Sequence, residues 1–327
     1  MFVRRAVPIK EEHAISELIE VTIGDVKQWL YIRGQNRYHP VLLMIHGSPG
    51  TAQIGFIRKF QSELEQHFVV VQWDQRGAGL SYSRDIPSES MNIDQLVYDT
   101  IDVTTYVLNH LNQQQLYLVG HSWGTILSML ALTRAPELYT RYFGISQVTH
   151  AGESDRLSYT KLLERAQADK NEKAYNTLLQ IGPPPWDSLK HGRIHQKYVE
   201  LLGGGITRDG KMVRKILLNI LTSKEYTWLD SLRFFKGQFF SMENLQAEME
   251  NINLLNNIKE INIPIYFLMG KYDLITPYEL TEQLFNQIKA PEKQFIMFEN
   301  SAHTPTLEEP ERYMQILLAE TRKDNIY

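Results

Sequence analysis

The chain has 327 residues, which is enough for one large domain or for a core domain that carries a sizeable insertion. Its net charge of −4, with lysines and arginines scattered along the chain, disfavours nucleic acid as a partner, and no stretch has the roughly 18 uncharged apolar residues of a membrane-spanning helix. The lack of cysteine excludes disulfide bonds, thiolate zinc sites and a cysteine nucleophile. Because the N-terminal segment lacks the apolar stretch of a secretory signal, we expect a cytoplasmic protein.

The first predicted elements form a hairpin. Residues 16–34 contain two strand-like runs joined by a Gly24-Asp25 turn, which is typical of antiparallel strands at the edge of a sheet. Six later runs are apolar throughout, as in strands covered on both faces; they begin at Val41, Val69, Leu116, Tyr142, Ile265 and Phe295. Segments with helical spacing alternate with several of them, at 56–66, 92–111, 125–135, 278–288 and 311–320. The pattern predicts an α/β fold with a mostly parallel central sheet and helices on both faces.

The alternation stops between about Thr149 and Ile258. This stretch is largely helical in pattern and is divided by proline and glycine clusters, so we predict a helical cap inserted after the sixth strand. The core domain would comprise residues 1–148 and 259–327, and the cap domain residues 149–258. His191 and His195 are four residues apart in the cap, but no glutamate follows His191 as in H-E-x-x-H, so we interpret both as surface side chains and expect no metal site.

A serine between two glycines follows the run that begins at Leu116. Gly120, Ser122 and Gly124 fit the pattern G-x-S-x-G, in which small neighbours let a strand turn sharply into a helix and expose the serine hydroxyl. A strand-like run precedes this motif and a helical pattern follows it, which is the context that the motif requires. The alternative is a tight turn with a buried serine. We predict that Ser122 is a nucleophile.

A serine nucleophile needs a base, and the base needs an acid that orients it. On a sheet of this kind the chain order is serine, acid, histidine. Asp273 lies just beyond one predicted strand, and His303 lies just beyond the next and is the only histidine after His195. A turn-forming aspartate and a structural loop histidine are the alternatives. The spacing therefore predicts a triad of Ser122, Asp273 and His303.

Acyl transfer also needs donors for the developing oxyanion. One should be the backbone N–H of Trp123, the residue after the nucleophile. The other should come from the loop after an early strand, where "HGSPG" offers the N–H of Ser48 and brings Gly47 close to the substrate. This loop could also be a simple β-turn. It does not fit a phosphate-binding loop because no Gly-Lys-Ser/Thr follows.

The motifs together resemble the α/β-hydrolases of the proline iminopeptidase family. "HGSPG" from His46, "WDQRGAGLS" from Trp73, "GHSWG" from Gly120, "GKYDLITP" from Gly270 and "SAH" from Ser301 occur in that family's order. The resemblance implies the α/β-hydrolase fold and peptides with N-terminal proline or a small residue as substrates. Within "DQRG" we expect Asp74 and Arg76 to form a buried ion pair that braces the loop.

The chain departs from this family at two places. Ser48 stands where the family has glycine, which is tolerable if only its N–H acts and its backbone angle does not demand glycine. The family's Trp-Glu-Gly cap signature, part of its site for the substrate amine, is absent. The cap contains several acids, most of which we interpret as solvated surface carboxylates; the candidates for substrate contact are Glu153 and Glu243, with Asp155 and Asp230 also noted. Phe235 could line an acyl or prolyl pocket, or belong to a cap helix packed on the core.

We therefore predict a serine hydrolase that acts on small peptides or small acyl substrates without a metal or organic cofactor. Similar caps occur in hydrolases of esters, lactones or amides, so a carboxylesterase or amidase is the alternative enzyme. A non-catalytic binding protein on the same fold is the alternative of another class. Dehalogenases and epoxide hydrolases, which share the fold, are disfavoured because they use aspartate where this chain has Ser122.

Overall fold

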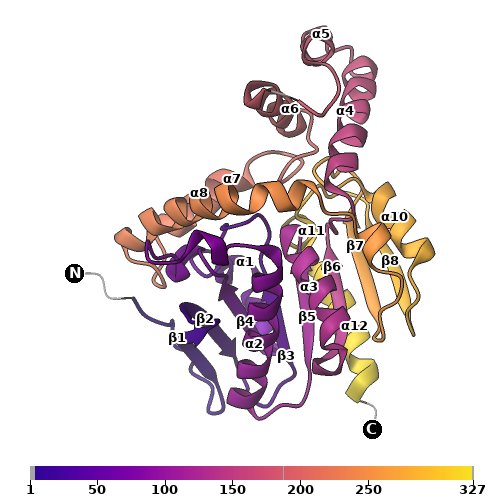
Figure 1. Ribbon diagram of the computed structural model, residues 1–327. Helices are drawn as coiled ribbons and strands as arrows, with labels where there is room; N and C mark the ends of the chain where they lie inside the picture. Colours follow the sequence, from indigo (N-terminus) through magenta and orange to yellow (C-terminus); the bar gives the residue numbers. More distant parts are fainter. Residues whose placement is uncertain (1–3, 187, 326–327) are drawn as a thin grey trace.

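A central sheet of eight strands organises the computed structural model, which describes residues 4–186 and 188–325 (Figure 1). The strand order is β1-β2-β4-β3-β5-β6-β7-β8. The strands are β1 (Ile15–Ile23), β2 (Val26–Gly34), β3 (Val41–Ile45), β4 (Val69–Asp74), β5 (Leu116–His121), β6 (Tyr139–Ile145), β7 (Ile265–Gly270) and β8 (Lys293–Phe298). They include all eight runs that the sequence predicts.

The strands at one edge of the sheet are antiparallel and the others are parallel. β1 pairs with β2 and β2 pairs with β4 in the antiparallel sense, whereas every pairing from β4 across to β8 is parallel. Gly24 and Asp25 connect β1 and β2 with positive φ angles of 53° and 63°, as a two-residue type I′ turn requires. The predicted edge hairpin and mostly parallel sheet are confirmed.

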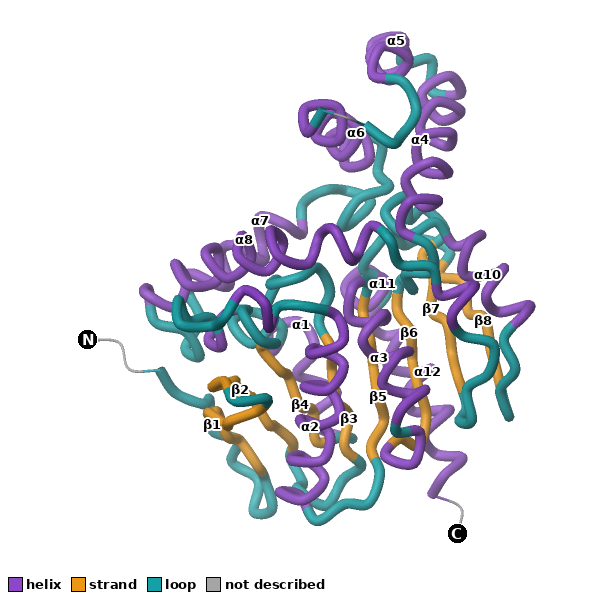
Figure 2. Tube along the Cα trace, viewed as in Figure 1, coloured by secondary structure: helices purple, strands orange, loops and turns teal. Residues whose placement is uncertain are grey.

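Helices cover both faces of the parallel strands, as Figure 2 shows in purple against orange. The side chains of β3 alternate between two apolar clusters, with Leu43 and Ile45 in one and Leu42 and Met44 in the other. The core helices are α1 (Arg58–Gln61), α2 (Ile93–Leu111), α3 (Trp123–Arg134), α10 (Tyr278–Gln287), α11 (Pro305–Glu308) and α12 (Pro310–Thr321). Helices α2, α3 and α10 pack on the first cluster, and α12 packs on the second. Burial on both faces explains why these strands are apolar throughout.

Six helices lie between β6 and β7, where the sequence predicts the cap: α4 (Ala151–Ala168), α5 (Glu172–Ile181), α6 (Leu189–Leu201), α7 (Met212–Leu221), α8 (Trp228–Glu250) and α9 (Leu254–Asn257). Helices α4 to α6 project away from the sheet, and α7 and α8 lie across it (Figure 1). His195 lies inside this cap, 5% exposed, with its Nε2 3.1 Å from Ser158 Oγ and its ring 4.7 Å from that of Trp186. The interpretation of His195 as a surface side chain is therefore wrong, because α4 and α6 pack their inner faces together.

Helix α8 is held against the core by close backbone contacts. A Cβ atom on Gly50 would lie 2.6 Å from the Cα of Gln238, and one on Gly237 would lie 2.6 Å from the carbonyl oxygen of Gly77. Real Cβ atoms do not approach other atoms so closely, so these glycines let α8 pack directly on the loops that follow β3 and β4. The long cap helix is thereby fixed over the end of the sheet.

Asp74 and Arg76 do not pair with each other, which corrects the prediction of an ion pair between them. Arg76 Nε is 2.7 Å from Asp99 Oδ2 on α2. The Asp74 carboxylate instead accepts hydrogen bonds from the Tyr226 hydroxyl at 2.5 Å and from the Leu80 N–H at 2.9 Å. Burial raises the pKa of Asp74 to about 7. Asp74 and Arg76 contact different partners because β4 ends at Asp74 and the chain turns before Arg76.

Within the described residues, no helix combines the length and the apolar character that crossing a membrane would need.

Candidate active site

Ser122 occupies a sharp turn between β5 and α3. Its φ and ψ angles are 51° and −121°, a conformation that L-residues rarely adopt and that costs about 1–3 kcal/mol. The turn is held on both sides, because the Ser122 N–H donates to the Ile145 carbonyl and the Thr125 N–H donates to the Ser122 carbonyl, each at 2.9 Å. The strand, turn and helix that the motif predicts are all present.

The two flanking glycines are needed for packing rather than for their own φ angles. A Cβ atom on Gly120 would lie 2.7 Å from Ser128 Oγ, and one on Gly124 would overlap the carbonyl oxygen of Ile45. The first turn of α3 therefore presses on the end of β3, which carries the "HGSPG" loop. Small residues around Ser122 bring these two loops together.

Gly124→Ala should destabilise the fold by about 2–4 kcal/mol, because the added methyl group meets rigid backbone at Ile45. Gly152→Ala, in the first turn of α4, is the matched control. A Cβ atom at Gly152 would lie 3.9 Å from its nearest neighbour, an ordinary contact distance. Urea unfolding measures both changes. Equal stability of the two variants would contradict the close packing.

His303 and Asp273 meet at the ends of neighbouring strands. Asp273 lies beyond β7, His303 lies beyond β8, and His303 Nδ1 is 2.9 Å from Asp273 Oδ2. Both side chains are buried. Parallel strands end at the same edge of a sheet, so residues 30 positions apart in the chain are brought into contact.

Donors from the segment after Asp273 surround its carboxylate. The Ile275 and Thr276 N–H groups donate to Oδ1 at 2.8 and 2.9 Å, and Thr276 Oγ1 donates to Oδ2 at 2.7 Å. Burial alone would raise the pKa of Asp273, but the neighbouring His303 and these hydrogen bonds hold it below its ordinary value. The sequence analysis did not identify Thr276, although an aspartate followed by threonine three positions later favours such a turn.

The backbone of His303 is also fixed. Its carbonyl oxygen accepts a hydrogen bond from Ser146 Oγ at 2.9 Å and lies 2.9 Å from His121 Nε2. Burial, with the neighbouring His303, lowers the pKa of His121 to about 4, so at neutral pH its uncharged ring donates through Nε2. His121 and Ser146 are further residues that sequence reasoning missed. They orient the loop that carries His303.

The two predicted oxyanion donors come from different elements, Ser48 from the loop after β3 and Trp123 from the start of α3, and both residues line the larger cavity with Ser122. Ser48 has a φ of 47°, so the position adopts the left-handed conformation that glycine favours, and serine accepts it at a cost of about 1 kcal/mol. Among the described residues, the N–H groups of Ser48 and Trp123 donate to no protein acceptor. Gly47 packs on the serine turn, because a Cβ atom there would lie 3.0 Å from Ser122 Cβ.

Gln75 connects this loop to the serine turn. Its Nε2 donates to the His46 carbonyl at 3.0 Å, and its Oε1 accepts from Trp123 Nε1 at 3.1 Å. Gln75 and Trp123 are each 1% exposed. One buried amide therefore fixes the spacing between the two predicted oxyanion donors. Gln75 belongs to the "DQRG" motif, but the sequence alone predicted no role for it.

Two cavities meet at Ser122, and Ser48, Ile206 and His303 line both. The larger cavity, about 450 Å³, lies under the cap and is bordered by Trp123, Thr276 and residues of α4 and α8. The smaller, about 120 Å³, is mostly apolar; its lining includes Met44, Gly47, Phe56, Ile57, Ile145, Ile216 and Leu307. A carbonyl group at Ser122 would therefore have room on two sides.

Most of the cap residues suggested by the sequence lie elsewhere. Glu153 is ion-paired with Arg156 at 2.8 Å, Phe235 and Glu243 are exposed on α8, and none of the three lines either cavity. Asp230 caps α8, pairs with Arg4 and lines neither cavity. Of the residues that the sequence suggested for substrate contact, Gly47 and the cap acid Asp155 each line a cavity together with Ser122.

Two other carboxylates line the larger cavity, Asp155 on α4 and Glu250 at the end of α8. The ion pairs formed within residues 4–186 and 188–325 include neither of them. Both residues are exposed at the edge of this cavity, where partial desolvation, and then the nearby Glu250 charge, raise the pKa of Asp155 to about 6. Both therefore remain available to a cation in the cavity.

Comparison with known proteins supports the family resemblance. A family model described as serine aminopeptidase, S33, matches residues 37–311. The chain is 40% identical over 314 residues to the probable aminopeptidase YbaC of Bacillus subtilis (strain 168), covering 96% of this chain and 99% of that protein. It is 26% identical over 285 residues to the proline iminopeptidase of Clostridioides difficile (strain 630), covering 84% and 87%.

The fold also matches solved structures. A proline iminopeptidase-related protein from Thermus thermophilus aligns with a TM-score of 0.62 at 17% identity, covering 93% of this chain and 96% of that one. At this identity the match concerns the fold alone. Together with the family match over most of the sequence, it shows that this chain is an α/β-hydrolase-fold enzyme that belongs to the serine aminopeptidase family S33.

Proposed function

We propose that this protein is a serine hydrolase that releases an N-terminal proline or another small residue from peptides through an acyl-enzyme intermediate. The observation that carries the proposal is the convergence of three groups. Ser122 and His303 line the same two cavities, and buried Asp273 contacts His303 Nδ1, which leaves Nε2 for proton transfer. This is the constellation that acyl transfer needs.

In the proposed reaction, His303 Nε2 takes the hydroxyl proton of Ser122 while Oγ bonds to the substrate carbonyl carbon. The N–H groups of Ser48 and Trp123 donate to the resulting oxyanion. The C–N bond then breaks, and His303 returns the proton to the leaving amine. Water attacks the acyl-enzyme with His303 again as base, which releases the amino acid and restores Ser122.

Asp155 and Glu250 are the proposed site for the substrate's N-terminal ammonium group. They line the larger cavity with Ser122 and have no cationic partner among the described residues. An ammonium ion is the group that would pair with two carboxylates at this position. The names of the relatives, probable aminopeptidase and proline iminopeptidase, support the same substrate class.

A substrate panel tests this proposal against the esterase alternative, which the small apolar cavity favours. The panel compares prolyl, alanyl and leucyl arylamides with p-nitrophenyl acetate and butyrate. We expect turnover of aminoacyl arylamides, and loss of that turnover when the substrate's amine is acylated. Hydrolysis of the esters alone would support an esterase and would overturn the aminopeptidase proposal.

Labelling with a fluorophosphonate separates an enzyme from a non-catalytic binding protein. We expect a single adduct on Ser122, identified by peptide mass spectrometry, and no adduct after heat unfolding. Folded protein that remains unlabelled would exclude the serine mechanism, whatever the substrate.

Asp155→Asn combined with Glu250→Gln should raise KM for prolyl arylamide about 10- to 100-fold, because a charge-assisted hydrogen bond contributes about 1.5–3 kcal/mol. Hydrolysis of p-nitrophenyl acetate should change less than about twofold, since this ester has no ammonium group. Glu153→Gln is the matched control, because it removes a carboxylate of the same helix that lies outside the cavity.

The same site predicts a pH effect. The pKa of Asp155 is raised to about 6, so this carboxylate is charged above that pH and neutral below it. The ratio of kcat/KM for prolyl arylamide to that for the ester should therefore fall as the pH drops from about 7 to 5. Taking the ratio cancels the pH effects that are common to both substrates. A ratio that is constant with pH would contradict the role of Asp155.

A further inference from the structure

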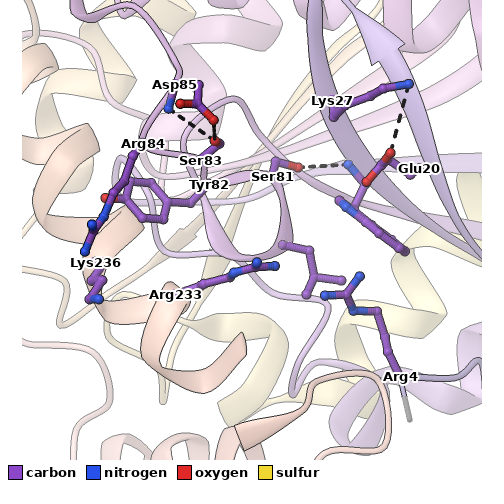
Figure 3. Close-up of a pocket in the computed structure, with 12 residues that line it drawn as sticks. Arg4, Glu20, Lys27, Ser81, Tyr82, Ser83, Arg84, Asp85, Arg233 and Lys236 are labelled. Carbon is purple, nitrogen blue, oxygen red and sulfur yellow. Dashed lines mark hydrogen bonds and ion pairs between the residues drawn. The ribbon is translucent and has the colours of Figure 1, made fainter. Parts of the chain in front are cut away.

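A second large cavity lies away from Ser122, between the edge hairpin and the start of the long cap helix. It has a volume of about 560 Å³ and shares no lining residue with the two cavities at Ser122. Its walls come from β1 and β2, from residues 80–85 and from the outer face of α8, with Arg4 at the base (Figure 3). Cavities of 300–1,000 Å³ are of the size that holds small ligands.

The lining is strongly basic. It contains five cationic side chains, Arg4, Lys27, Arg84, Arg233 and Lys236, and two carboxylates, Glu20 and Asp85. The lining side chains therefore carry an excess of three positive charges, or of two when the buried Asp230 carboxylate that contacts Arg4 and Arg233 is counted, although the whole chain has a net charge of −4. A cationic hollow on an acidic protein attracts anions and raises their local concentration.

The arginines at the base are held in place by one buried carboxylate. Arg4 Nη2 is 2.7 Å and Arg233 Nη1 is 3.4 Å from the same oxygen, Oδ1 of Asp230. Arg4 is also fixed from above, because its guanidinium lies 4.3 Å from the centre of the Trp29 ring. In Figure 3 the guanidinium groups of Arg4 and Arg233 point toward one another. One carboxylate cannot neutralise two guanidinium groups, so positive charge remains at the base.

The other end of the cavity carries two cations with no carboxylate partner. Arg84 and Lys236 lie together in Figure 3, and neither takes part in an ion pair within the described residues. The Asp85 carboxylate beside Arg84 is bound instead to the Ser83 hydroxyl at 3.0 Å. At the opposite rim, Lys27 and Glu20 are 4.0 Å apart and exposed, a separation that contributes little.

We propose that this cavity binds a small anion that carries at least two linked phosphate groups. Two pairs of cations, Arg4 with Arg233 and Arg84 with Lys236, give two places for phosphate oxygens, and planar guanidinium groups match phosphate geometry. Each phosphate group carries about 1.5–2 negative charges at neutral pH, which is about the charge of the Arg84 and Lys236 pair, for which the described residues provide no carboxylate partner. The proposal is independent of the hydrolase reaction.

Isothermal titration calorimetry with inorganic tripolyphosphate tests the proposal on the full chain at low salt. The test variant is Arg84→Gln with Lys236→Gln, because these side chains lie outside the Asp230 contacts and their loss should leave folding intact. Lys173→Gln with Lys197→Gln is the matched control, since it removes the same charge from exposed cap positions. Thermal melts and ester hydrolysis verify that each variant is folded.

We expect tripolyphosphate to bind the wild type and the control equally, and the test variant at least about 10-fold more weakly. Raising the salt concentration should weaken binding to the wild type more than to the test variant. No binding to the wild type at about 1 mM ligand, or equal binding to all three proteins, would overturn the proposal. Tighter binding of a hexaglutamate peptide than of tripolyphosphate would also overturn it, in favour of an acidic protein segment.

Discussion

Ser122→Ala is expected to lower kcat for prolyl arylamide by about 10⁵- to 10⁶-fold. Without the hydroxyl no acyl-enzyme forms, and only the oxyanion donors and substrate binding remain to accelerate attack by water. KM should change little, because the proposed ammonium site and both cavities are untouched. The measurement is steady-state kinetics with the aminoacyl arylamide that the substrate panel selects.

Ser128→Ala is the matched control for Ser122→Ala. Ser128 is also a buried serine, in the middle of α3, but its hydroxyl donates to the Gly124 carbonyl at 2.8 Å and it lines neither cavity. Its loss should leave kcat within about twofold and cost about 1 kcal/mol of stability. If Ser122→Ala retained more than about one hundredth of the activity, Ser122 could not be the nucleophile.

Asp273→Asn should lower kcat by about 10⁴-fold with little change in fold. The asparagine amide can present N–H rather than an oxygen acceptor to His303 Nδ1, which favours the tautomer with its proton on Nε2, where the base must be free. The Ile275 and Thr276 N–H groups can still donate to the remaining oxygen, so the turn should persist. Single-turnover kinetics with p-nitrophenyl acetate would locate the loss in acylation.

Thr276→Val tests the same part of the site as Asp273→Asn with a smaller change. It removes the 2.7 Å hydrogen bond to Asp273 Oδ2 but leaves the carboxylate that holds His303. We expect a loss of about 10-fold in kcat, because a hydrogen bond to a charged group contributes about 1.5 kcal/mol and this one acts through Asp273. Losses of equal size in the two variants would mean that the charge of Asp273 has no special role.

Asp273 should also affect stability as a function of pH. Its pKa is lower in the folded protein than the ordinary value of 3.8, so the ionised form stabilises the fold above that pH. This contribution is lost as the pH falls through the folded-state pKa. Urea unfolding of Asp273→Asn should therefore show a weaker loss of stability between about pH 5 and 3 than the wild type shows.

The sequence by itself was sufficient to predict the strands and to select the three residues proposed as the triad. Strands covered on both faces must be apolar throughout, so the runs at Val41, Val69 and Leu116 were recognisable without tertiary information. The turn at Ser122 was equally recognisable because its glycines, the apolar run before it and the helical pattern after it all lie in one short stretch of the sequence. Asp273 and His303 followed from chain order, since parallel strands end at one edge.

The contacts of the cap were decided only by the tertiary structure. Successive helical residues are rotated by about 100°, so Asp155 lines the cavity while Glu153, two positions earlier on α4, pairs with Arg156 outside the cavity. Glu250 lines the same cavity from another helix and is 95 positions later in the sequence. A local sequence pattern cannot predict a contact over such a separation. The same is true of Arg76, whose partner Asp99 lies on α2 rather than beside it in the chain. Local chemistry fixed the strands and the turn, whereas side-chain partners across elements depended on how α4, α8 and α2 pack.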